Sequence, residues 1–493
     1  MKLHVIYDDT IVAPARVTSL IGITHFGKLI YRRHRLADHL RDAVALAGID
    51  SIIELTSAAD LAALADRRRQ GDMAQDRFLI CPSHIVSTRP AEAIVQFLKQ
   101  TVHAPGSLLL QVPGAPERDS WLLLNAAQLS DYLAHRATDD LASFFDARRS
   151  ELIFFPDKLG LINLSDDVVL LDFLSGAFDV RFFNSLVRDR YTITKRSTDK
   201  AKLKREYAFY GLMPPAMQMF FVQPFDFADE GEVSAYRMER LFMPDMALQT
   251  LHGAIDQREF ALFLDKVFHF VGSRARRAAG SAEAEAEIEK LYVTKVRERI
   301  DQLKQTEHYP ALLPYLDRMC GGIDALFDRY MALFAKARGR FPTDHMVIGH
   351  GDLCFSNILY GKTMQMLRLI DPRGASSEAD LYTNPYYDLA KLSHSIVGGY
   401  DLINHDMFDV EVNPDLQLQL RLDRPPADWA VAMFADRLKA AGFDFELVRI
   451  CEASLFISML ALHIDRPRKV LGFAVNAANI VAGLESSTGG RRA

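Results

Sequence analysis

The sequence predicts an α+β chain in which an N-terminal α/β domain with a mainly parallel sheet precedes a longer, two-lobed part. Two observations lead to this prediction. Residues 1–175 alternate strand-like and helix-like segments, an order typical of parallel sheets covered by helices. Beyond them, paired strand patterns in residues 176–245 give way to amphipathic helices in residues 246–485. Residues 486–493 are rich in Ser, Gly and Arg and are expected to be a disordered tail.

The N-terminal domain is expected to contain short apolar strands separated by helices. A helix is predicted over residues 36–47, because Leu36, Leu40 and Val44 lie on one face and Gly48 follows its end. The other elements are predicted by their apolar runs: a helix at 92–100 and strands at 3–7, 51–55, 77–81, 107–112, 121–124, 152–155 and 168–173.

In the first lobe of the longer part, residues 191–196 alternate like a strand with one buried face, and a helix is predicted over residues 200–212. Residues 233–241 are predicted to form a further strand. In the second lobe, an acidic helix that becomes basic begins at Ser281, which matches the helix dipole. The remaining helices are predicted around residues 323–334, 429–441 and 445–462.

The most informative motif is His350-Gly351-Asp352, followed by Asn357 and then by Asp371. Asp352 can accept a proton from an attacking hydroxyl group. Asn357 and Asp371 offer an amide and a carboxylate oxygen, which suit Mg²⁺ rather than zinc. This set of groups is what the transfer of a γ-phosphoryl group from ATP to a hydroxyl requires.

The segments around the motif are expected to bring its parts together. Residues 346–348 form an apolar run that predicts a buried strand, so that the motif lies on the following loop, where catalytic groups usually sit. Residues 358–360 and 366–370 are predicted to form a hairpin. Such a hairpin would return Asp371 to the side of Asn357.

The pattern H-G-D-x-x-x-x-N, followed by an Asp that closes a strand, resembles the aminoglycoside phosphotransferase and choline kinase family, a two-lobed relative of protein kinases. The resemblance implies that Asp352 is the catalytic base and that Asn357 and Asp371 bind Mg²⁺. It also implies that His350 is structural and that Asp388 of Tyr-Asp-Leu-Ala supports the loop. Asp388 has an alternative interpretation as an ordinary helix N-cap.

A kinase of this kind needs a cation on the nucleotide phosphates, oriented by a carboxylate from a helix. Lys195, in the predicted strand, and Glu206, within the helix that follows, are the candidate pair. The alternative is a solvated lysine and a surface glutamate in a helix rich in charge.

The segment expected to cover the phosphates departs from the protein-kinase pattern. No glycine occurs between Phe178 and Lys195, so Asn184 and Ser185 are the candidates for the turn there. Backbone groups from Glu239 to Leu241, at the end of a predicted strand, are expected to bind the adenine.

These features predict an ATP- and Mg²⁺-dependent phosphotransferase that acts on the hydroxyl of a small metabolite or lipid. The motif Ile-Asp-Pro-Arg-Gly at 370–374 and the preceding domain look similar to kinases of bacterial surface-glycan and envelope-lipid pathways. The expected acceptor is therefore a sugar, a polyol or a ceramide-type lipid. Two alternatives remain: an inactive pseudokinase scaffold, which the absent glycines favour, and a bifunctional nucleotidyltransferase–kinase.

The second alternative depends on residues 27–50, which faintly resemble a sugar nucleotidyltransferase through a Gly-Lys segment, a helix and a Gly-Ile-Asp-x-Ile-Ile strand. Residues 1–20 contain no glycine, so the nucleotide loop of such enzymes is missing. The resemblance therefore implies a domain that has lost nucleotide chemistry.

Composition narrows the class of protein. A net charge of −6 argues against a dedicated nucleic-acid partner. Four widely spaced cysteines give neither a disulfide framework nor a zinc pattern. Without a signal peptide or an apolar run of membrane-spanning length, the protein is expected to be cytoplasmic, and peripheral contact with a membrane stays open.

Overall fold

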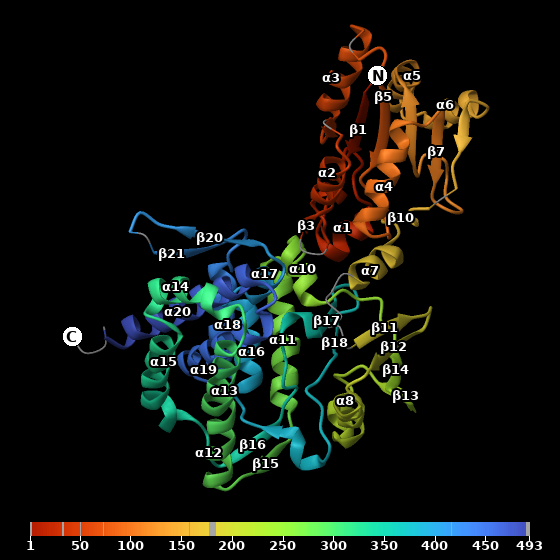
Figure 1. Ribbon diagram of the computed structural model, residues 1–493. Helices are drawn as coiled ribbons and strands as arrows, with labels where there is room; N and C mark the ends of the chain where they lie inside the picture. The colour runs from red at the N-terminus through yellow and green to blue at the C-terminus, as the bar shows by residue number, and fades with distance from the viewer. Residues whose placement is uncertain are drawn as a thin grey trace. The chain divides into compact units, whose positions relative to one another are not determined.

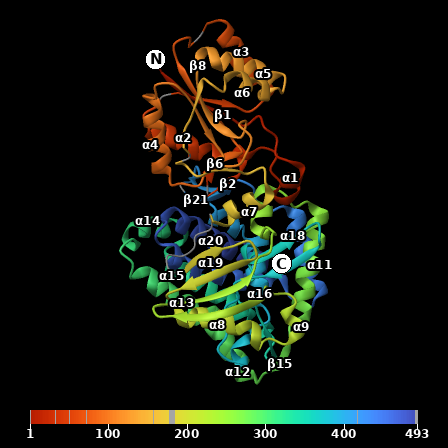
Figure 2. The ribbon, with the colours of Figure 1, turned by 90° about the vertical axis from the view of Figure 1, so that its right-hand side faces the viewer.

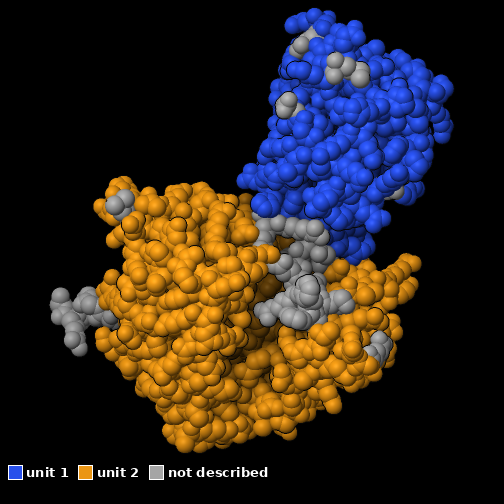
Figure 3. Space-filling view, in the orientation of Figure 1, with its two compact units in different colours: residues 1–178, 252–254 blue, residues 179–251, 255–493 orange. Residues whose placement is uncertain are grey.

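The computed structural model describes residues 2–31, 34–49, 51–71, 73–156, 158–176, 184–415 and 417–489. The chain divides into two compact units, which Figure 3 distinguishes by colour. Unit 1 comprises residues 1–178 and 252–254, and unit 2 comprises residues 179–251 and 255–493.

Unit 1 is built on a six-stranded sheet with the order β4-β1-β5-β8-β7-β9. Five strands run in one direction, and β8 runs antiparallel to both of its neighbours. The strands are β1 (Leu3–Asp8), β4 (Ile52–Leu55), β5 (Arg77–Pro82), β7 (Ser107–Gln111), β8 (Ser120–Asn125) and β9 (Leu152–Phe154). Two-stranded ladders add β2 (Ile30–Tyr31) with β3 (His34–Arg35), and β6 (Ile85–Ser87) with β10 (Leu161–Asn163).

Helices cover both faces of this sheet, as Figure 2 shows for α2 and α4 on one side and α3, α5 and α6 on the other. Successive strand residues point to opposite faces, so Val5 and Leu79 join one core while Ile6 and Ile80 join the other. The helices are α1 (Ala15–Ile21), α2 (Leu36–Leu46), α3 (Ala58–Arg69), α4 (Ala91–Val102), α5 (Ala126–Ala137), α6 (Leu141–Arg148) and α7 (Asp167–Gly176), with a 3₁₀ turn, η1 (Phe26–Lys28).

One predicted strand of unit 1 is wrong. Residues 168–173 lie in helix α7, because Asp166 accepts hydrogen bonds from the backbone N–H groups of Val168 and Val169 and so starts a helix. A short apolar run has no period of its own, and its length alone does not distinguish a buried strand from a buried helix.

Unit 2 begins with an antiparallel sheet in the order β11-β12-β14-β13, against which helix α8 packs (Figure 1). The elements are β11 (Asn184–Arg188), β12 (Thr192–Ser197), α8 (Lys200–Leu212), α9 (Pro215–Gln218), β13 (Pro224–Glu230) and β14 (Val233–Glu239). The side chain of Asp199 accepts the Lys202 N–H and caps α8.

The rest of unit 2 is mainly helical. The helices are α10 (Met246–His252), α11 (Gln257–Ser273), α12 (Ser281–Glu289), α13 (Lys295–Lys304), α14 (Tyr309–Cys320), α15 (Ile323–Ala337), α16 (Tyr387–Ile396), α17 (Tyr400–Asn404), α18 (Asp428–Ala440), α19 (Phe445–Met459) and α20 (Pro467–Gly489). A π-helical turn, η2 (Lys290–Thr294), joins α12 to α13; 3₁₀ turns are η3 (Arg338–Arg340), η4 (Phe355–Asn357), η5 (Glu378–Leu381) and η6 (Leu460–His463).

Short strands position the loops between these helices. The strands are β15 (Arg276–Ala278), β16 (His345–Ile348), β17 (Ile358–Gly361), β18 (Met366–Leu369), β19 (Tyr382–Thr383), β20 (Phe408–Val412) and β21 (Leu418–Leu422). The β17–β18 ladder is the predicted hairpin, and β16 pairs with β15 and β19. The mixed α and β content that the sequence predicts is confirmed.

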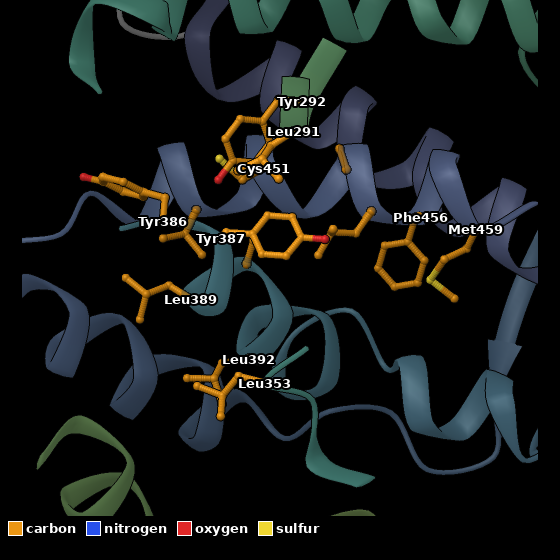
Figure 4. Packing of buried hydrophobic residues seen from close by; sticks show 14 of the residues in the cluster. Leu291, Tyr292, Leu353, Tyr386, Tyr387, Leu389, Leu392, Cys451, Phe456 and Met459 are labelled. Carbon is orange, nitrogen blue, oxygen red and sulfur yellow. The ribbon is translucent and has the colours of Figure 1, made fainter. Parts of the chain in front are cut away.

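The core of unit 2 holds α16 between the loop after β16 and α19. Figure 4 shows Leu389 and Leu392 of α16 near Leu353 of the loop, with Cys451 of α19 beside Tyr292. All five side chains are fully buried. The loop motif therefore rests on packed helices rather than on a mobile surface.

Helix α20 corrects two expectations. It continues through residues 486–489, which were predicted to be part of the disordered tail; residues 490–493 lie outside the described residues. Its stretch 467–487 is also long and apolar enough to cross a membrane, contrary to the expectation of no such run. Because 56% of its most apolar 18 residues are buried inside the protein and the helix packs against α19, its apolar character is explained by the core of unit 2.

Replacement of Phe334 by Ala tests the core of unit 2. This ring is 1% exposed, so we expect Phe334→Ala to lower the free energy of unfolding by about 3–5 kcal/mol. The measurement is denaturant unfolding followed by circular dichroism. Met364→Ala is the control, since Met364 is 65% exposed and its loss should cost less than about 0.5 kcal/mol. Equal losses in the two variants would contradict this core.

Candidate active site

The loop after β16 is held by the carboxylate of Asp388. Asp388 Oδ2 accepts the His350 N–H at 2.9 Å and Oδ1 accepts the Gly351 N–H at 2.8 Å, while Arg274 Nη1 lies 3.5 Å from Oδ2. Asp388 is fully buried and lies in the first turn of α16, whose N-cap is Tyr386. The alternative that Asp388 is the N-cap is therefore wrong.

Gly351 is required by the shape of this loop. Its φ is +81°, a left-handed conformation that other residues rarely adopt. A Cβ atom at this position would lie 2.6 Å from Cβ of Arg373. The close approach keeps the segment after Asp371 against the loop that carries Asp352.

His350 is a structural link between the loop and the hairpin. Its Nδ1 accepts the Asp352 N–H at 3.1 Å, so its Nε2–H donates to the Ile370 carbonyl at 2.9 Å. Burial lowers the pKa of His350, which outweighs the nearby carboxylates and favours the neutral ring. The ring also stacks on Phe221.

Asp352 is partly open to solvent and contacts two side chains. Asn357 Nδ2 donates to the Asp352 carbonyl at 2.8 Å and to its Oδ2 at 3.1 Å. Lys391 Nζ lies 2.9 Å from Oδ1. The Asp352 side chain is 44% exposed, so it is the open end of this group.

The charge of Asp352 is set mainly by Lys391. Enclosure by the protein opposes ionisation of Asp352, but Lys391 and then the Asn357 hydrogen bond outweigh it, and the pKa is lowered from its usual value. For Lys391 itself, burial favours the neutral form, but Asp352 outweighs this effect and raises the pKa. Both groups are thus charged at neutral pH.

Lys391 is a site residue that the sequence motif did not identify. It lies three residues after Asp388 on α16, so one helix holds both the support of the loop and the cation on Asp352. The only signal in the sequence was a lysine one turn beyond the Asp of Tyr-Asp-Leu-Ala. Nothing local related it to residue 352.

Lys195 contacts both its predicted partner Glu206 and Asp371 at the end of the hairpin. Its Nζ lies 2.7 Å from Glu206 Oε2 and 2.9 Å from Asp371 Oδ1. Lys195 and Glu206 are each 6% exposed, so the alternative of a solvated lysine and a surface glutamate is wrong. Burial opposes the charge of Lys195, but Asp371, Tyr236 and Glu206 together raise its pKa.

Asp371 lies just beyond β18, where the hairpin returns it to Asn357. The Ile370 N–H donates to the Asn357 carbonyl at 3.1 Å. Asp371 has φ of +55°, in the left-handed region that Asp tolerates better than most residues, and its side chain is 48% exposed. It is therefore open on the side away from Lys195.

Asn357 and Asp371 suit Mg²⁺ better than they suit a metal whose ligands all come from the protein. Among the described residues, no group of three or more His, Cys, Asp or Glu side chains is suited to a metal. Asn357 and Asp371 supply one amide and one carboxylate oxygen. Mg²⁺ is usually bound by one or two such ligands together with phosphate oxygens and water.

The other residues predicted to contact the nucleotide lie in strands or directly after one. Asn184 and Ser185 do not form a turn, because their backbone lies in β11 opposite Ser197 and Arg196; the preceding Phe182 and Phe183 lie outside the described residues. Glu239 is the last residue of β14 and pairs with Thr192. Leu241 follows two residues later, and between them the Arg240 N–H donates to the Tyr191 carbonyl.

A buried carboxylate lies near the loop without a satisfied hydrogen bond. Asp401, in α17, is 4% exposed, and neither of its oxygens has a hydrogen-bond partner among the described residues. Burial raises the pKa of Asp401 to about 7, and the charge of Asp352 adds to this effect. Burial also raises the pKa of the nearby Cys354 thiol, so this cysteine is not an activated thiolate.

Comparison with known proteins gives a distant structural similarity. No protein-family model matches the chain, and no curated protein matches it. Three similar solved structures are phosphotransferases. The first is a thermostable mutant of aminoglycoside phosphotransferase APH(4)-Ia with AMP-PNP and hygromycin B, with 9% identity, coverage of 64% of this chain and 99% of that chain, and a TM-score of 0.35. The second is a GDP complex of an aminoglycoside 2′-phosphotransferase-IIIa mutant, with 11% identity, coverage of 64% of this chain and 91% of that chain, and a TM-score of 0.35. The third is choline kinase from Cryptosporidium parvum Iowa II, with 10% identity, coverage of 62% of this chain and 87% of that chain, and a TM-score of 0.32.

TM-scores this low leave the function to be judged from the geometry of the site itself. The chain covers nearly the whole of the first of these enzymes, yet the identity is 9%. The positions of Asp352, Lys391, Lys195 and Asp371 are therefore the observations on which a functional proposal has to rest.

Asp401→Asn provides a test of the buried carboxylate. Since the folded-state pKa is raised to about 7, the folded protein keeps a proton that the unfolded chain releases near pH 4, and stability falls as pH rises through this window. Above pH 7 the buried charge destabilises the native state. We expect the variant to be more stable than the wild type at pH 8, by at most about 4 kcal/mol, with little difference at pH 4.

The measurement is thermal unfolding at a series of pH values. Asp436→Asn is the control, because Asp436 is exposed on α18 and its replacement should give a small, pH-independent change. A stability gain of Asp401→Asn that is the same at pH 4 and pH 8 would contradict the raised pKa.

Proposed function

We propose that the chain is an ATP- and Mg²⁺-dependent phosphotransferase that acts on the hydroxyl of a small molecule or lipid. The observation that carries the proposal is the arrangement around Lys195, which contacts both Glu206 and Asp371 although Asp371 lies far away in the sequence. An ammonium group held between a helix carboxylate and a metal-binding carboxylate is the arrangement that a kinase uses to hold nucleotide phosphates.

Each residue of the site has a distinct task in this proposal. Lys195 has three N–H donors, of which two meet Glu206 and Asp371, so the third remains for a phosphate oxygen. Asn357 and Asp371 would hold Mg²⁺, which supplies neutralisation of the phosphate charge. Glu206 fixes the position of the Lys195 ammonium group.

Asp352 acts on the acceptor. The acceptor hydroxyl donates a hydrogen bond to the Asp352 carboxylate, its oxygen forms a bond to the γ-phosphorus, and the bond from that phosphorus to the bridging oxygen breaks, so that ADP leaves. The proton of the hydroxyl passes to Asp352. Lys391 keeps Asp352 ionised beforehand, which is the state that a base requires.

The finer parts of the proposal rest on the sequence resemblance. They are a sugar, polyol or lipid alcohol of bacterial cell-envelope metabolism as acceptor, adenine binding by the backbone from Glu239 to Leu241, and a cytoplasmic location. The four cysteines are all unpaired, which agrees with a reducing compartment. Peripheral contact with a membrane would accompany a lipid acceptor.

The experiment measures ATP consumption with a panel of alcohols, sugars, amino alcohols and lipids. We expect turnover with at least one acceptor, and a fall of about 10²–10⁴-fold in kcat for Asp352→Ala. Asp371→Ala should abolish activity because it removes a metal ligand and a partner of Lys195. Asp324→Ala is the control, since its carboxylate is on the surface of α15 and is 70% exposed.

The outcomes separate the competing functions. ATP binding without turnover on any acceptor would favour the pseudokinase, for which the glycine-free segment before Lys195 is the supporting observation. Pyrophosphate release from CTP or UTP with a sugar phosphate would favour the bifunctional enzyme. Full activity of a folded Asp352→Ala variant would exclude Asp352 as the base.

Lys391→Met tests the electrostatic support of Asp352. Removal of the ammonium leaves the partly enclosed carboxylate without its main stabilising charge, so the pKa of Asp352 should rise. We expect the acidic limb of the pH profile of kcat/KM to shift to higher pH. Lys391→Arg should restore the limb toward the wild-type position, and Lys336→Met, on the exposed face of α15, should leave it unchanged.

A further inference from the structure

A cavity of about 310 Å³ lies in unit 2 among residues that are distinct from the proposed active site. Its walls come from the end of α11, the strands β15 and β16, Pro385 before α16, and the end of α18. Three arginines and one histidine line it: Arg274, Arg276, Arg437 and His345. Among the described residues that line the cavity, none is acidic.

The cationic residues of this cavity have carboxylate partners that do not line it. Arg437 lies 2.5 Å from Asp265, and His345 lies 2.7 Å from Asp344. Arg276 is exposed, and the same Asp344 lies within reach of its charge, since the His345 hydrogen bond and then Arg276 lower the pKa of Asp344. Three guanidinium groups therefore line one cavity, and their carboxylate partners lie outside its lining.

The pKa of Arg274 depends on its burial and on its charged neighbours. Burial lowers the pKa of Arg274, Asp388 counters this, and the neighbouring Arg276 lowers it further. Like charges that share one hollow are an unfavourable arrangement unless an anion enters. A phosphate or carboxylate would be bound by charge-assisted hydrogen bonds from the arginines, which are among the strongest in proteins.

The remaining walls of the cavity are apolar. Phe268 and Val271 come from α11, Val347 from β16, and Phe443 from the segment after α18. A volume of this size is at the lower end of ligand pockets. The cavity therefore suits a small organic anion whose body is apolar or aromatic better than an inorganic ion alone.

The cavity is connected to the catalytic loop through Arg274. The Arg274 Nη1 and Nη2 atoms donate to the Pro385 carbonyl at 3.3 Å, and Nη1 also lies 3.5 Å from Asp388 Oδ2. Asp388 in turn accepts the N–H groups of His350 and Gly351. The Arg274 guanidinium is thus linked through Asp388 to Gly351, the residue before Asp352.

We propose that this cavity is a binding site for a small organic phosphate or carboxylate with an apolar body, and that its occupation acts on the catalytic loop through Arg274 and Asp388. The anion binds Arg276 and Arg437 and attracts Arg274 away from Asp388. The loop that carries Asp352 then loses part of its support. The binding step is independent of the proposed function, whereas its effect on catalysis rests on that function.

The test uses phenyl phosphate, with phenol as the uncharged control, and isothermal titration calorimetry on the full chain. We expect saturable binding of one phenyl phosphate per chain and no binding of phenol. The double variant Arg276→Gln/Arg437→Gln should weaken binding at least tenfold. The matched control Arg258→Gln/Arg421→Gln, which removes two exposed arginines of the same unit, should bind within twofold of the wild type.

A nucleotide-site variant distinguishes the two phosphate sites. Binding that is lost in Lys195→Ala but kept in Arg276→Gln/Arg437→Gln would place phenyl phosphate in the proposed ATP site and overturn the inference. Absence of saturable binding would overturn it as well. 3-Phenylpropionate, in the same titration, shows whether a carboxylate replaces the phosphate.

The link to the loop is measured by hydrogen exchange, which needs no turnover. We expect exchange of the amides of residues 349–357 to accelerate several-fold when phenyl phosphate is bound, and not in Arg276→Gln/Arg437→Gln. Binding without such a change would overturn the link to Asp388. Because neither measurement involves ATP, failure here is distinguishable from failure of the proposed phosphotransferase activity.

Discussion

The fully buried carboxylate of Asp388 is the constraint on which the site depends. A buried charge is tolerated only when its oxygens are matched by donors, and here two backbone N–H groups and a guanidinium supply them. Since the two N–H groups belong to His350 and Gly351, the carboxylate attaches the end of β16 to the first turn of α16. The loop that carries Asp352 therefore has its position set by a packed helix.

The same helix explains the electrostatics of the site. Lys391 follows Asp388 by three residues, so it lies one turn along α16 and reaches Asp352. On the other side, Lys195 neutralises part of the charge of Glu206 and Asp371. Lys391 thus stabilises the ionised form of Asp352, which enclosure by the protein would otherwise oppose. The His350 side chain joins the two halves by its hydrogen bond to Ile370.

The elements around the motif were predictable because their signals are local. The hairpin β17–β18, strand β12 and helix α8 follow from an apolar period, a turn and a capping Asp199 within a few residues. Where the local signal is ambiguous, the prediction failed. Residues 168–173 form a helix rather than a strand, Asn184 and Ser185 lie in β11 rather than in a turn, and α20 continues into the expected tail. In each case the neighbouring packing or capping, and not propensity, decides the conformation.

The residue types and spacing of Asp352, Asn357 and Asp371 are properties of the sequence alone, because a loop followed by a hairpin brings them together through local folding. The partners that give these groups their charge and orientation come from elsewhere. Lys195 reaches Asp371 across 176 residues, and Arg274 reaches Asp388 across 114. Such contacts are created only when separate elements pack, so no local pattern encodes them. The choice between the two interpretations of Asp388, the contact of Lys391 and the cationic cavity were decided by the tertiary structure.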